Sequence, residues 1–166
     1  MTWRVLLVGV ACSIVPDLDV IGFRYGIRYD DVWGHRGLPH SLFFASLLSV
    51  ALVGLYYRRR PRGVQAGLLC YFFLCTASHG VLDAMTDGGL GVAFFSPFDT
   101  SRYFFGVRPV VVSPIGISAF FSNDALRVLA SEVEWIWLPT LAAFLILRGL
   151  QRVWVGQSAV ERSRTD

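Results

Sequence analysis

Residues 41–82 decide the fold of this chain. They read SLFFASLLSVALVGLYYRRRPRGVQAGLLCYFFLCTASHGVL, which is two apolar runs joined by an arginine-rich turn. The first run, residues 41–57, has no charged residue, and the second, residues 64–82, has His79 but no Asp, Glu or Arg. A helix needs roughly 20 mainly apolar residues to cross the hydrocarbon core of a bilayer. The two runs therefore predict a helical hairpin in a membrane.

The composition agrees with this prediction. Of the 166 residues, 54% are hydrophobic and 16% are charged, and the mean hydropathy is +0.53, which is unusually apolar for a soluble domain of this size. Shorter apolar stretches at residues 5–15 and 135–147 add two helices. We therefore predict an all-α integral membrane protein with about four membrane helices and a long irregular interfacial segment between the third and fourth. Residues 1–156 would form one domain, and residues 157–166 a disordered cytoplasmic tail.

Every basic side chain is an arginine, and the arginines predict a topology. Two groups lie in the turn between the clear spans and after the last apolar stretch: Arg58, Arg59, Arg60 and Arg62, then Arg148, Arg152, Arg162 and Arg164. Because short basic segments tend to stay in the cytoplasm, we predict that both groups and both termini are inside. Six others would then be outside, where an anionic partner would account for them: Arg24, Arg28, Arg36, Arg102, Arg108 and Arg127.

Several other classes of protein are not indicated. The arginines form no nucleic-acid-binding module, so no nucleic-acid partner is predicted. Cys12, Cys70 and Cys75 lie in apolar stretches without metal-site spacing, which indicates buried thiols rather than disulfides or zinc ligands. The first apolar run faintly resembles a secretory or lipoprotein signal, but cleavage at Cys12 would detach the helix that leads to Asp17. We predict that this run remains as a membrane segment.

Three short polar clusters interrupt the apolar sequence and together hold all three histidines. They are PDLD at residues 16–19, HRGLPHS at residues 35–41 and SHGVLD at residues 78–83. In the predicted topology each cluster lies at the outer end of a helix. Imidazole and carboxylate groups are ligands for Zn²⁺ or Mn²⁺, and they are costly beside hydrocarbon unless something compensates them. The clusters therefore predict a metal site at the outer face.

Six side chains in these clusters are the candidate metal ligands: Asp17, Asp19, His35, His40, His79 and Asp83. His79 and Asp83 are four residues apart and would share one helix face. Each pair also has a purely structural interpretation, as a ring oriented by an acid, a histidine pair capping a helix, or acids capping loop donors. A single catalytic zinc uses three protein ligands and a water. Six candidates therefore predict either two ions or some residues that only orient the ligands.

The neighbouring polar residues suggest catalytic roles. A bound metal would activate a water for hydrolysis without a serine or cysteine nucleophile. We predict Asp17, Arg36 and Asp87 as catalytic side chains, with Arg36 holding a phosphate through its planar guanidinium. Arg36 could equally be an interfacial arginine, and Asp87 a turn residue. Glu132 or Glu134 could add a carboxylate, although acids at a helix start are often merely solvated.

A segment rich in phenylalanine, residues 94–121, is predicted to cover this site. Its aromatic residues alternate with turn formers, which suits a lid at the membrane interface better than a loop in water. Arg36, Arg102 and Arg108 are the predicted substrate-binding residues. Residues 110–112 could form a short strand.

Local signals predict several element boundaries. The first helix should end at Pro16, with an irregular connection over residues 17–34. Asn123 or Asp124 could cap the last helical region. Pro139 should kink or split that region, because proline lacks a backbone donor.

The motifs taken in order resemble a known family. Pro-Asp-Leu-Asp, His-Arg-Gly-x-x-His-Ser and Ser-His-x-x-Leu-Asp-x-x-Thr, followed by Phe-Ser-Pro-Phe and Val-Ser-Pro-Ile-Gly, resemble the YdjM-like family of membrane-bound metal-dependent hydrolases over roughly residues 9–147. That family is distantly similar to zinc-dependent phospholipases C and single-strand-specific zinc nucleases. The resemblance implies a phosphoesterase with one or two divalent ions, zinc or else manganese, on the same six residues. Family members often begin with a further stretch carrying a Thr-His pair, which this chain does not include.

These observations favour a membrane-embedded metal-dependent hydrolase of a bacterial or archaeal cytoplasmic (inner) membrane. Its expected substrate and partner is a membrane lipid, or a phosphate-containing lipid-linked molecule, at the outer face. The alternative is a non-enzymatic membrane protein whose histidines bind haem or carry metal ions, with His40 and His79 as axial ligands. A third interpretation, a structural or regulatory membrane protein, predicts no metal.

Overall fold

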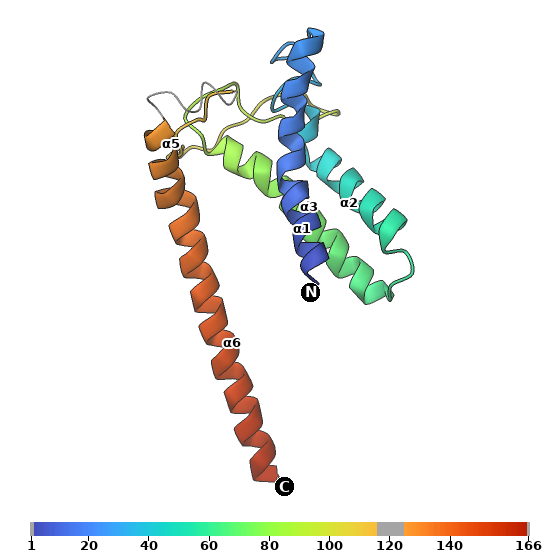
Figure 1. The fold of residues 1–166 in the computed structure, drawn as a ribbon, viewed down its shortest axis with the longest axis vertical. Helices are drawn as coiled ribbons and strands as arrows, with labels where there is room; N and C mark the ends of the chain where they lie inside the picture. The colour runs from blue at the N-terminus through green and yellow to red at the C-terminus, as the bar shows by residue number, and fades with distance from the viewer. Residues whose placement is uncertain (1, 116–124, 166) are drawn as a thin grey trace. The chain divides into compact units, whose positions relative to one another are not determined.

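The computed structural model describes the chain except for residues 1, 116–124 and 166, and describes side chains as far as Arg152. Every element in the described residues is a helix, as predicted (Figure 1). The chain divides into two compact units, residues 1–115 and residues 116–166. The single domain over residues 1–156 stays a prediction. Each unit is described by itself.

The first unit begins with helix α1 (Trp3–Ile14), which continues as the 3₁₀ helix η1 (Val15–Tyr25). The α-helix therefore ends two residues before Pro16, close to the predicted boundary, but the chain stays helical beyond it. Proline cannot donate to the preceding turn, but it is tolerated at the start of a new helical segment, and here the chain changes from α to 3₁₀ at that point. The helix ends at Gly26, which has the left-handed φ of 80° that glycine adopts without strain. The irregular connection is thus confined to the residues after Tyr25.

Two antiparallel helices, α2 (Leu42–Tyr56) and α3 (Arg62–Ala84), form the predicted hairpin. The short 3₁₀ helix η2 (Leu38–His40) precedes α2, and the Ser41 hydroxyl caps α2 by accepting a hydrogen bond from the Phe44 amide at 3.0 Å. Apolar side chains from all three long helices of this unit form its core: Val5, Cys12, Val53 and Phe72. Helix α3 packs against both α1 and α2, so it is the central element of the unit.

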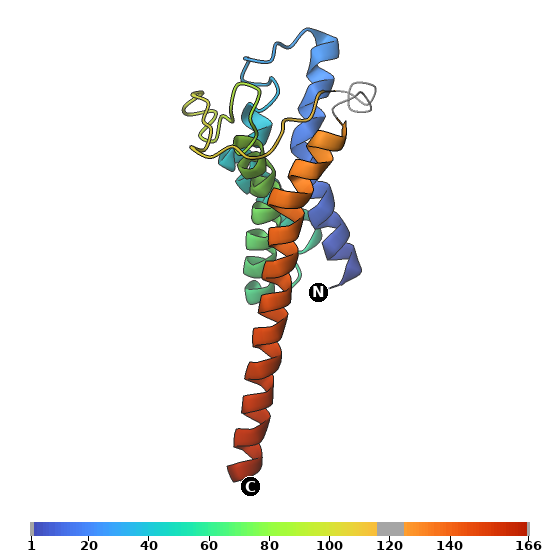
Figure 2. The same ribbon diagram turned by 90° about the vertical axis from the view of Figure 1, so that its left-hand side faces the viewer.

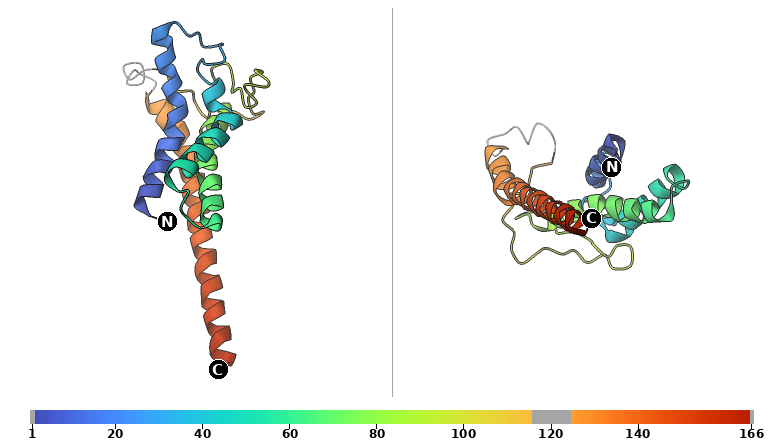
Figure 3. Two further views of the ribbon diagram at one scale, coloured as in Figure 1. Left: turned by 90° about the vertical axis from the view of Figure 1, so that its right-hand side faces the viewer. Right: turned by 90° about the horizontal axis from the view of Figure 1, so that it is seen from below.

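The three polar clusters gather at one end of this unit. Figures 1 and 2 show η1, η2, the C-terminal end of α3 and the loop that follows it at the end opposite the arginine-rich turn between α2 and α3. Figure 3 shows the same separation from the other side. Because helices that alternate in direction return their ends to the same level, sequence-distant clusters meet in one layer.

Three helical stretches are long and apolar enough to cross a membrane: Trp3–Tyr25, Arg62–Ala84 and Ala125–Arg152. Helix α2 is a shorter apolar helix. Many large apolar side chains on these helices are exposed, for example Leu47 at 57% and Phe144 at 55%, which suits contact with lipid tails rather than water. The predicted all-α membrane protein is confirmed.

The loop after α3, residues 85–115, has no strand in the part the structure describes. Isolated bridges join Thr86 to Val110 and Val92 to Tyr103, so the predicted short strand at residues 110–112 does not form. Pro109 and Pro114 flank this stretch and cannot donate to a ladder, which limits pairing. Several large apolar side chains in the loop are exposed: Leu90, Phe95, Phe98, Phe105 and Val107.

The second unit is a helical rod made of α5 (Ala125–Glu132), the π-helix η3 (Val133–Trp137) and α6 (Leu138–Thr165). The π segment ends two residues before Pro139, where the sequence predicted a kink or a split in the helix. A proline removes a regular backbone bond, and a change of hydrogen-bond register absorbs that loss. Helix α6 continues to Thr165, which differs from the disordered tail predicted for residues 157–166. The predicted caps Asn123 and Asp124 lie outside the described residues.

The close packing of α3 against η2 gives a first prediction. A Cβ added at Gly80 would lie 2.8 Å from the His40 carbonyl oxygen, whereas a Cβ at Gly67 on the same helix would meet nothing within 4 Å. Both alanine substitutions gain helix propensity, but only Gly80→Ala must push η2 away. We expect Gly80→Ala to be less stable than Gly67→Ala by about 1–3 kcal/mol, measured by denaturant unfolding in detergent. Equal stability of the two variants would show that this contact is loose.

Candidate metal centre

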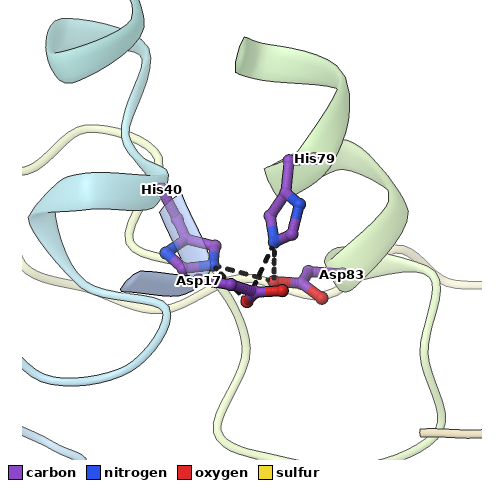
Figure 4. Close-up of side chains that lie close together, drawn as sticks. All are labelled: Asp17, His40, His79 and Asp83. Carbon is purple, nitrogen blue, oxygen red and sulfur yellow. Dashed lines mark hydrogen bonds and ion pairs between the residues drawn. The ribbon is translucent and has the colours of Figure 1, made fainter. Parts of the chain in front are cut away.

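Four of the six predicted ligands converge on one point in the first unit. Asp17 comes from η1, His40 from η2, and His79 and Asp83 from the last turns of α3 (Figure 4). One nitrogen or oxygen from each of them lies within 4.8 Å of all the others. The structure thus brings four of the predicted ligands together, and their role as metal ligands stays a prediction.

The spacing of the four atoms suits a small divalent ion. His79 Nε2 lies 3.2 Å from Asp17 Oδ1 and 3.6 Å from Asp83 Oδ2. His40 Nε2 lies 3.7 Å and 3.2 Å from the same two oxygens. Zinc bonds of about 2.0–2.2 Å in a tetrahedron place neighbouring ligand atoms about 3.3–3.6 Å apart. The residues therefore fit an ion held by two imidazoles and two carboxylates.

The opposite edge of each imidazole faces an oxygen atom, which His79 meets in a hydrogen bond and His40 in a close contact that is poorly aligned for one. His79 Nδ1 lies 2.8 Å from the Ser13 carbonyl oxygen, which can only accept, so the Nδ1 proton is donated there. His40 Nδ1 lies 3.1 Å from Asp19 Oδ2. In both rings Nε2 is left facing the common point. Such outer partners orient the histidine ligands of metal sites and raise their basicity.

The contacts around His40 are close but poorly aligned for hydrogen bonds. This side chain is buried, and neither ring nitrogen makes a hydrogen bond of good geometry, although carboxylate oxygens lie nearby on both sides. Asp83 Oδ2 is likewise buried without a hydrogen bond. An unsatisfied buried polar atom is costly. An ion at the common point would satisfy Nε2 of His40 and Oδ2 of Asp83 together, because it needs no aligned hydrogen.

The charges at this site also call for a cation. Burial alone would lower the pKa of the His40 imidazole, but the carboxylates of Asp17, Asp19 and Asp83 outweigh burial and raise the pKa to about 10. Without an ion, His40 would therefore carry a proton at neutral pH. With neutral imidazoles, the three carboxylates and the guanidinium of Arg36 leave two negative charges, which one divalent ion balances.

Asp19 and His35 form a second group that shares His40. Asp19 Oδ1 lies 2.8 Å from His35 Nδ1, and its Oδ2 faces His40 as described and also accepts the Arg36 amide at 3.2 Å. The His35 ring packs edge-on against Tyr29 and His40. Both oxygens of Asp19 are thus occupied by protein groups. One nitrogen or oxygen from each of Asp19, His35 and His40 lies within 4.8 Å of the other two, so the geometry allows either a second ion here or an orienting role for Asp19 and His35.

The predicted arginines and Asp87 lie outside the four-residue group. Arg36 is 3% exposed and lies behind Asp83, bonded to protein acceptors. Arg102 donates to the backbone carbonyls of His35 and Tyr29 at 2.9 Å each, and so ties two loops together. Arg108 lies over the Phe104 ring at 4.6 Å. The exposed Asp87 accepts from the Val112 amide at 2.8 Å, as a turn residue would. Their predicted roles in catalysis and substrate binding stay predictions.

Some residues that support the site were missed from the sequence. Ser13 acts through its carbonyl, and a backbone contact leaves no signal in residue type. Thr86 accepts from Arg36 and follows Asp83 by three residues, so its place in the last motif could have marked it. Glu132 and Glu134, which the sequence suggested could add a carboxylate to the site, belong to the second unit.

The comparisons with known proteins agree with the motifs. The model of a family described as YdjM inner membrane protein matches residues 1–155. The chain belongs to this family. Inner membrane protein YbcI of Escherichia coli (strain K12) is 37% identical over 139 residues, which cover 82% of this chain and 78% of YbcI. No solved structure matches. This YdjM-family chain is therefore an inner membrane protein with a histidine and aspartate group that could hold a metal ion.

The shared position of His40 gives a second prediction. Asp19→Asn keeps the shape of the side chain but weakens its hold on His40 Nδ1, so affinity for Zn²⁺ should fall about 10- to 100-fold. His35→Ala leaves Asp19 in contact with His40 and should cost less. Competition with a chromophoric chelator measures both affinities in detergent. If His35→Ala instead halves the number of ions bound per chain, His35 is the ligand of a second ion.

Proposed function

We propose that this YdjM-family protein is a membrane-embedded metal-dependent hydrolase, acting as a phosphoesterase on a lipid or lipid-linked phosphate at the outer membrane face. The observation that carries the proposal is the group formed by Asp17, His40, His79 and Asp83, whose ligand atoms have the spacing of a zinc site. Its mixture of imidazole and carboxylate groups suits zinc first and manganese second.

One side of the group is open. The Asp17 side chain is 50% exposed, whereas His40 is fully buried and Asp83 is 17% exposed. When bound, a divalent ion at such a site supplies Lewis-acid activation of water and of a phosphoryl oxygen. We assign to the Asp17 carboxylate the acceptance of a proton from an attacking water, because it is the most exposed of the four ligands. His40 and His79 hold their Nε2 atoms in place through Asp19 and Ser13.

The surroundings support a lipid-borne substrate. The loop over residues 85–115 exposes Phe98 at 82%, Val107 at 72% and Phe95 at 53%. Side chains of this kind are costly in water and prefer the membrane interface. A substrate whose tails remain in the bilayer would present its phosphate at that level. The outer-face orientation rests on the arginines of the turn between α2 and α3.

The geometry does not favour the haem alternative. The His40 and His79 rings have centroids 4.9 Å apart, and both Nε2 atoms face carboxylate oxygens at 3.2–3.7 Å. A porphyrin between the rings would have to displace Asp17 and Asp83. If the purified protein binds no haem, its absorption spectrum should have no Soret band.

The test begins with protein purified without a metal-chelating tag. Elemental analysis should find a divalent metal, and a screen of phospholipid vesicles and generic phosphodiesters should find hydrolysis that a chelator removes and Zn²⁺ or Mn²⁺ restores. Metal content without hydrolysis of any phosphate ester would refute the phosphoesterase and leave a metal-binding membrane protein.

The orientation has a separate prediction. Ser101 lies in the exposed loop after α3, and Arg59 lies in the turn between α2 and α3. In intact cells, a membrane-impermeant thiol reagent should label Ser101→Cys, and should label Arg59→Cys only after permeabilisation. The wild-type chain gives the background from its native cysteines. The reverse pattern would place the site on the cytoplasmic side.

A further inference from the structure

Arg36 is a buried charge in a strained backbone position. Its φ of 63° is left-handed, which a residue with a side chain adopts at a cost. The surrounding structure holds it there. Its amide donates to Asp19 Oδ2 at 3.2 Å, and its carbonyl accepts from the Ala93 amide at 3.0 Å. A strained backbone conformation beside a functional site suggests that the site needs the Arg36 side chain in this position.

The guanidinium of Arg36 divides the two oxygens of Asp83 between different partners. Its NH2 donates to Asp83 Oδ1 at 3.2 Å, while Asp83 Oδ2 faces the imidazoles of His40 and His79. Its NH1 donates to the Thr86 hydroxyl at 3.0 Å and to the Gly88 carbonyl at 2.9 Å. These contacts fix the plane of the guanidinium, and the guanidinium in turn fixes the carboxylate.

The space around this guanidinium is closely fitted. A Cβ at Gly89 would lie 2.8 Å from Arg36 NH1, and Gly89 itself has a φ of 86°. The Arg36 side chain is 4% exposed and the Asp83 side chain 17%, so the donors of the guanidinium face protein groups rather than bulk water. A planar fork of donors can hold the Thr86 side and the Asp83 side at once, which the point charge of lysine cannot do.

We infer that Arg36 is a positioning residue of the metal centre, which holds Asp83 Oδ1 so that Oδ2 faces the ion. This inference rests on the proposed metal centre, not on the hydrolysis. Two effects of opposite sign follow from removing Arg36. Loss of its positive charge would strengthen cation binding, whereas loss of its hydrogen bond frees Asp83 to rotate and leaves a buried oxygen without a donor. We expect the loss of orientation to outweigh the gain from removing the positive charge, so that metal affinity falls. A buried charge that loses its partner is strongly penalised, and outer contacts of this kind are worth about 10- to 100-fold in metal affinity.

The experiment compares full-length variants in detergent by Zn²⁺ affinity and by the absorption spectrum of bound Co²⁺. Arg36→Gln should weaken binding about 10- to 100-fold and change the Co²⁺ bands, which report ligand geometry. Arg36→Lys keeps the charge but should recover only part of the affinity. Thr86→Val removes one acceptor of the guanidinium without changing side-chain size, so it should lower the Zn²⁺ affinity less than Arg36→Gln does. This variant keeps Arg36 itself, so we expect it to fold even if Arg36→Gln does not.

Arg102→Gln is the matched control. Arg102 is also partly buried and also donates to loop carbonyls, but it touches none of the four ligands, so this variant should keep wild-type affinity and the wild-type spectrum. Equal losses at Arg36 and Arg102 would overturn the inference in favour of general loop packing. Unchanged or tighter binding in Arg36→Gln, or full recovery in Arg36→Lys, would also overturn it. A wild-type chain that binds no ion would instead refute the metal centre itself, and one that binds but does not hydrolyse would refute only the phosphoesterase.

Discussion

Replacing His40 with alanine is expected to weaken Zn²⁺ binding on the order of 100- to 1000-fold. Four-ligand zinc sites contribute about 10–16 kcal/mol, so the loss of one ligand costs roughly a quarter of that free energy. His40 is the member that contacts both groups, since its Nε2 faces Asp17 and Asp83 and its Nδ1 faces Asp19. Its loss removes a ligand and also one of the groups that Asp19 Oδ2 contacts. Chelator competition on the purified variant measures the change.

The control for this prediction is an alanine substitution at a residue beside the site. Ser78→Ala changes an exposed residue next to His79 whose hydroxyl donates to the Cys75 carbonyl at 2.9 Å. It should leave the affinity unchanged. If His40→Ala binds Zn²⁺ as tightly as Ser78→Ala does, the four-residue group is not the metal site, whatever metal the protein contains.

The second large effect concerns hydrolysis. His79→Ala or Asp83→Ala should abolish phosphate ester hydrolysis while the protein stays in the membrane. Each variant removes one of the four ligand atoms, whereas the apolar surfaces of α1, α2 and α3 that drive insertion are unchanged. The measurements are turnover on the substrate found by screening, metal content, and the membrane fraction after alkaline extraction.

Asp83→Asn refines this second prediction. The amide keeps an oxygen that can accept from Arg36, but it has no negative charge for the ion, so we expect metal loss close to that of Asp83→Ala. Full metal content in both His79→Ala and Asp83→Ala would show that this pair has a structural role. Loss of both variants from the membrane would show that the site is needed for folding, and metal titration of the refolded chain would then replace the activity assay.

Much of the fold could be predicted because a bilayer permits few structures. The uncharged stretch of residues 41–57 and the nearly uncharged stretch of residues 64–82 had to be helices, since only helices satisfy their own backbone groups in lipid. Boundaries at Pro16 and Pro139 could not be predicted in detail. Proline excludes one hydrogen bond, but whether the chain then stops, changes to 3₁₀ or inserts a π turn depends on what packs around it.

The candidate site divides in the same way. Residue types and the four-residue spacing of His79 and Asp83 identified the ligand chemistry, because few side chains bind divalent ions and few acids are tolerated beside hydrocarbon. The sequence could not separate the ligands from the residues that orient them. Asp17 and Asp19 are two positions apart in the same motif. Asp17 faces the common point beside His79 Nε2, whereas Asp19 contacts the opposite edge of His40, at Nδ1.

The sequence by itself thus determined that this chain crosses a membrane as helices and carries imidazole and carboxylate groups at their ends, because hydropathy and ligand chemistry are properties of the residues themselves. Only the tertiary structure decided which atoms meet. It turned the Nε2 atoms of His40 and His79 toward Asp17 and Asp83, and it placed the predicted phosphate-binding Arg36 behind Asp83 in a buried, left-handed position. Those outcomes depend on distances between η1, η2 and α3, which the packing of helices distant in sequence sets.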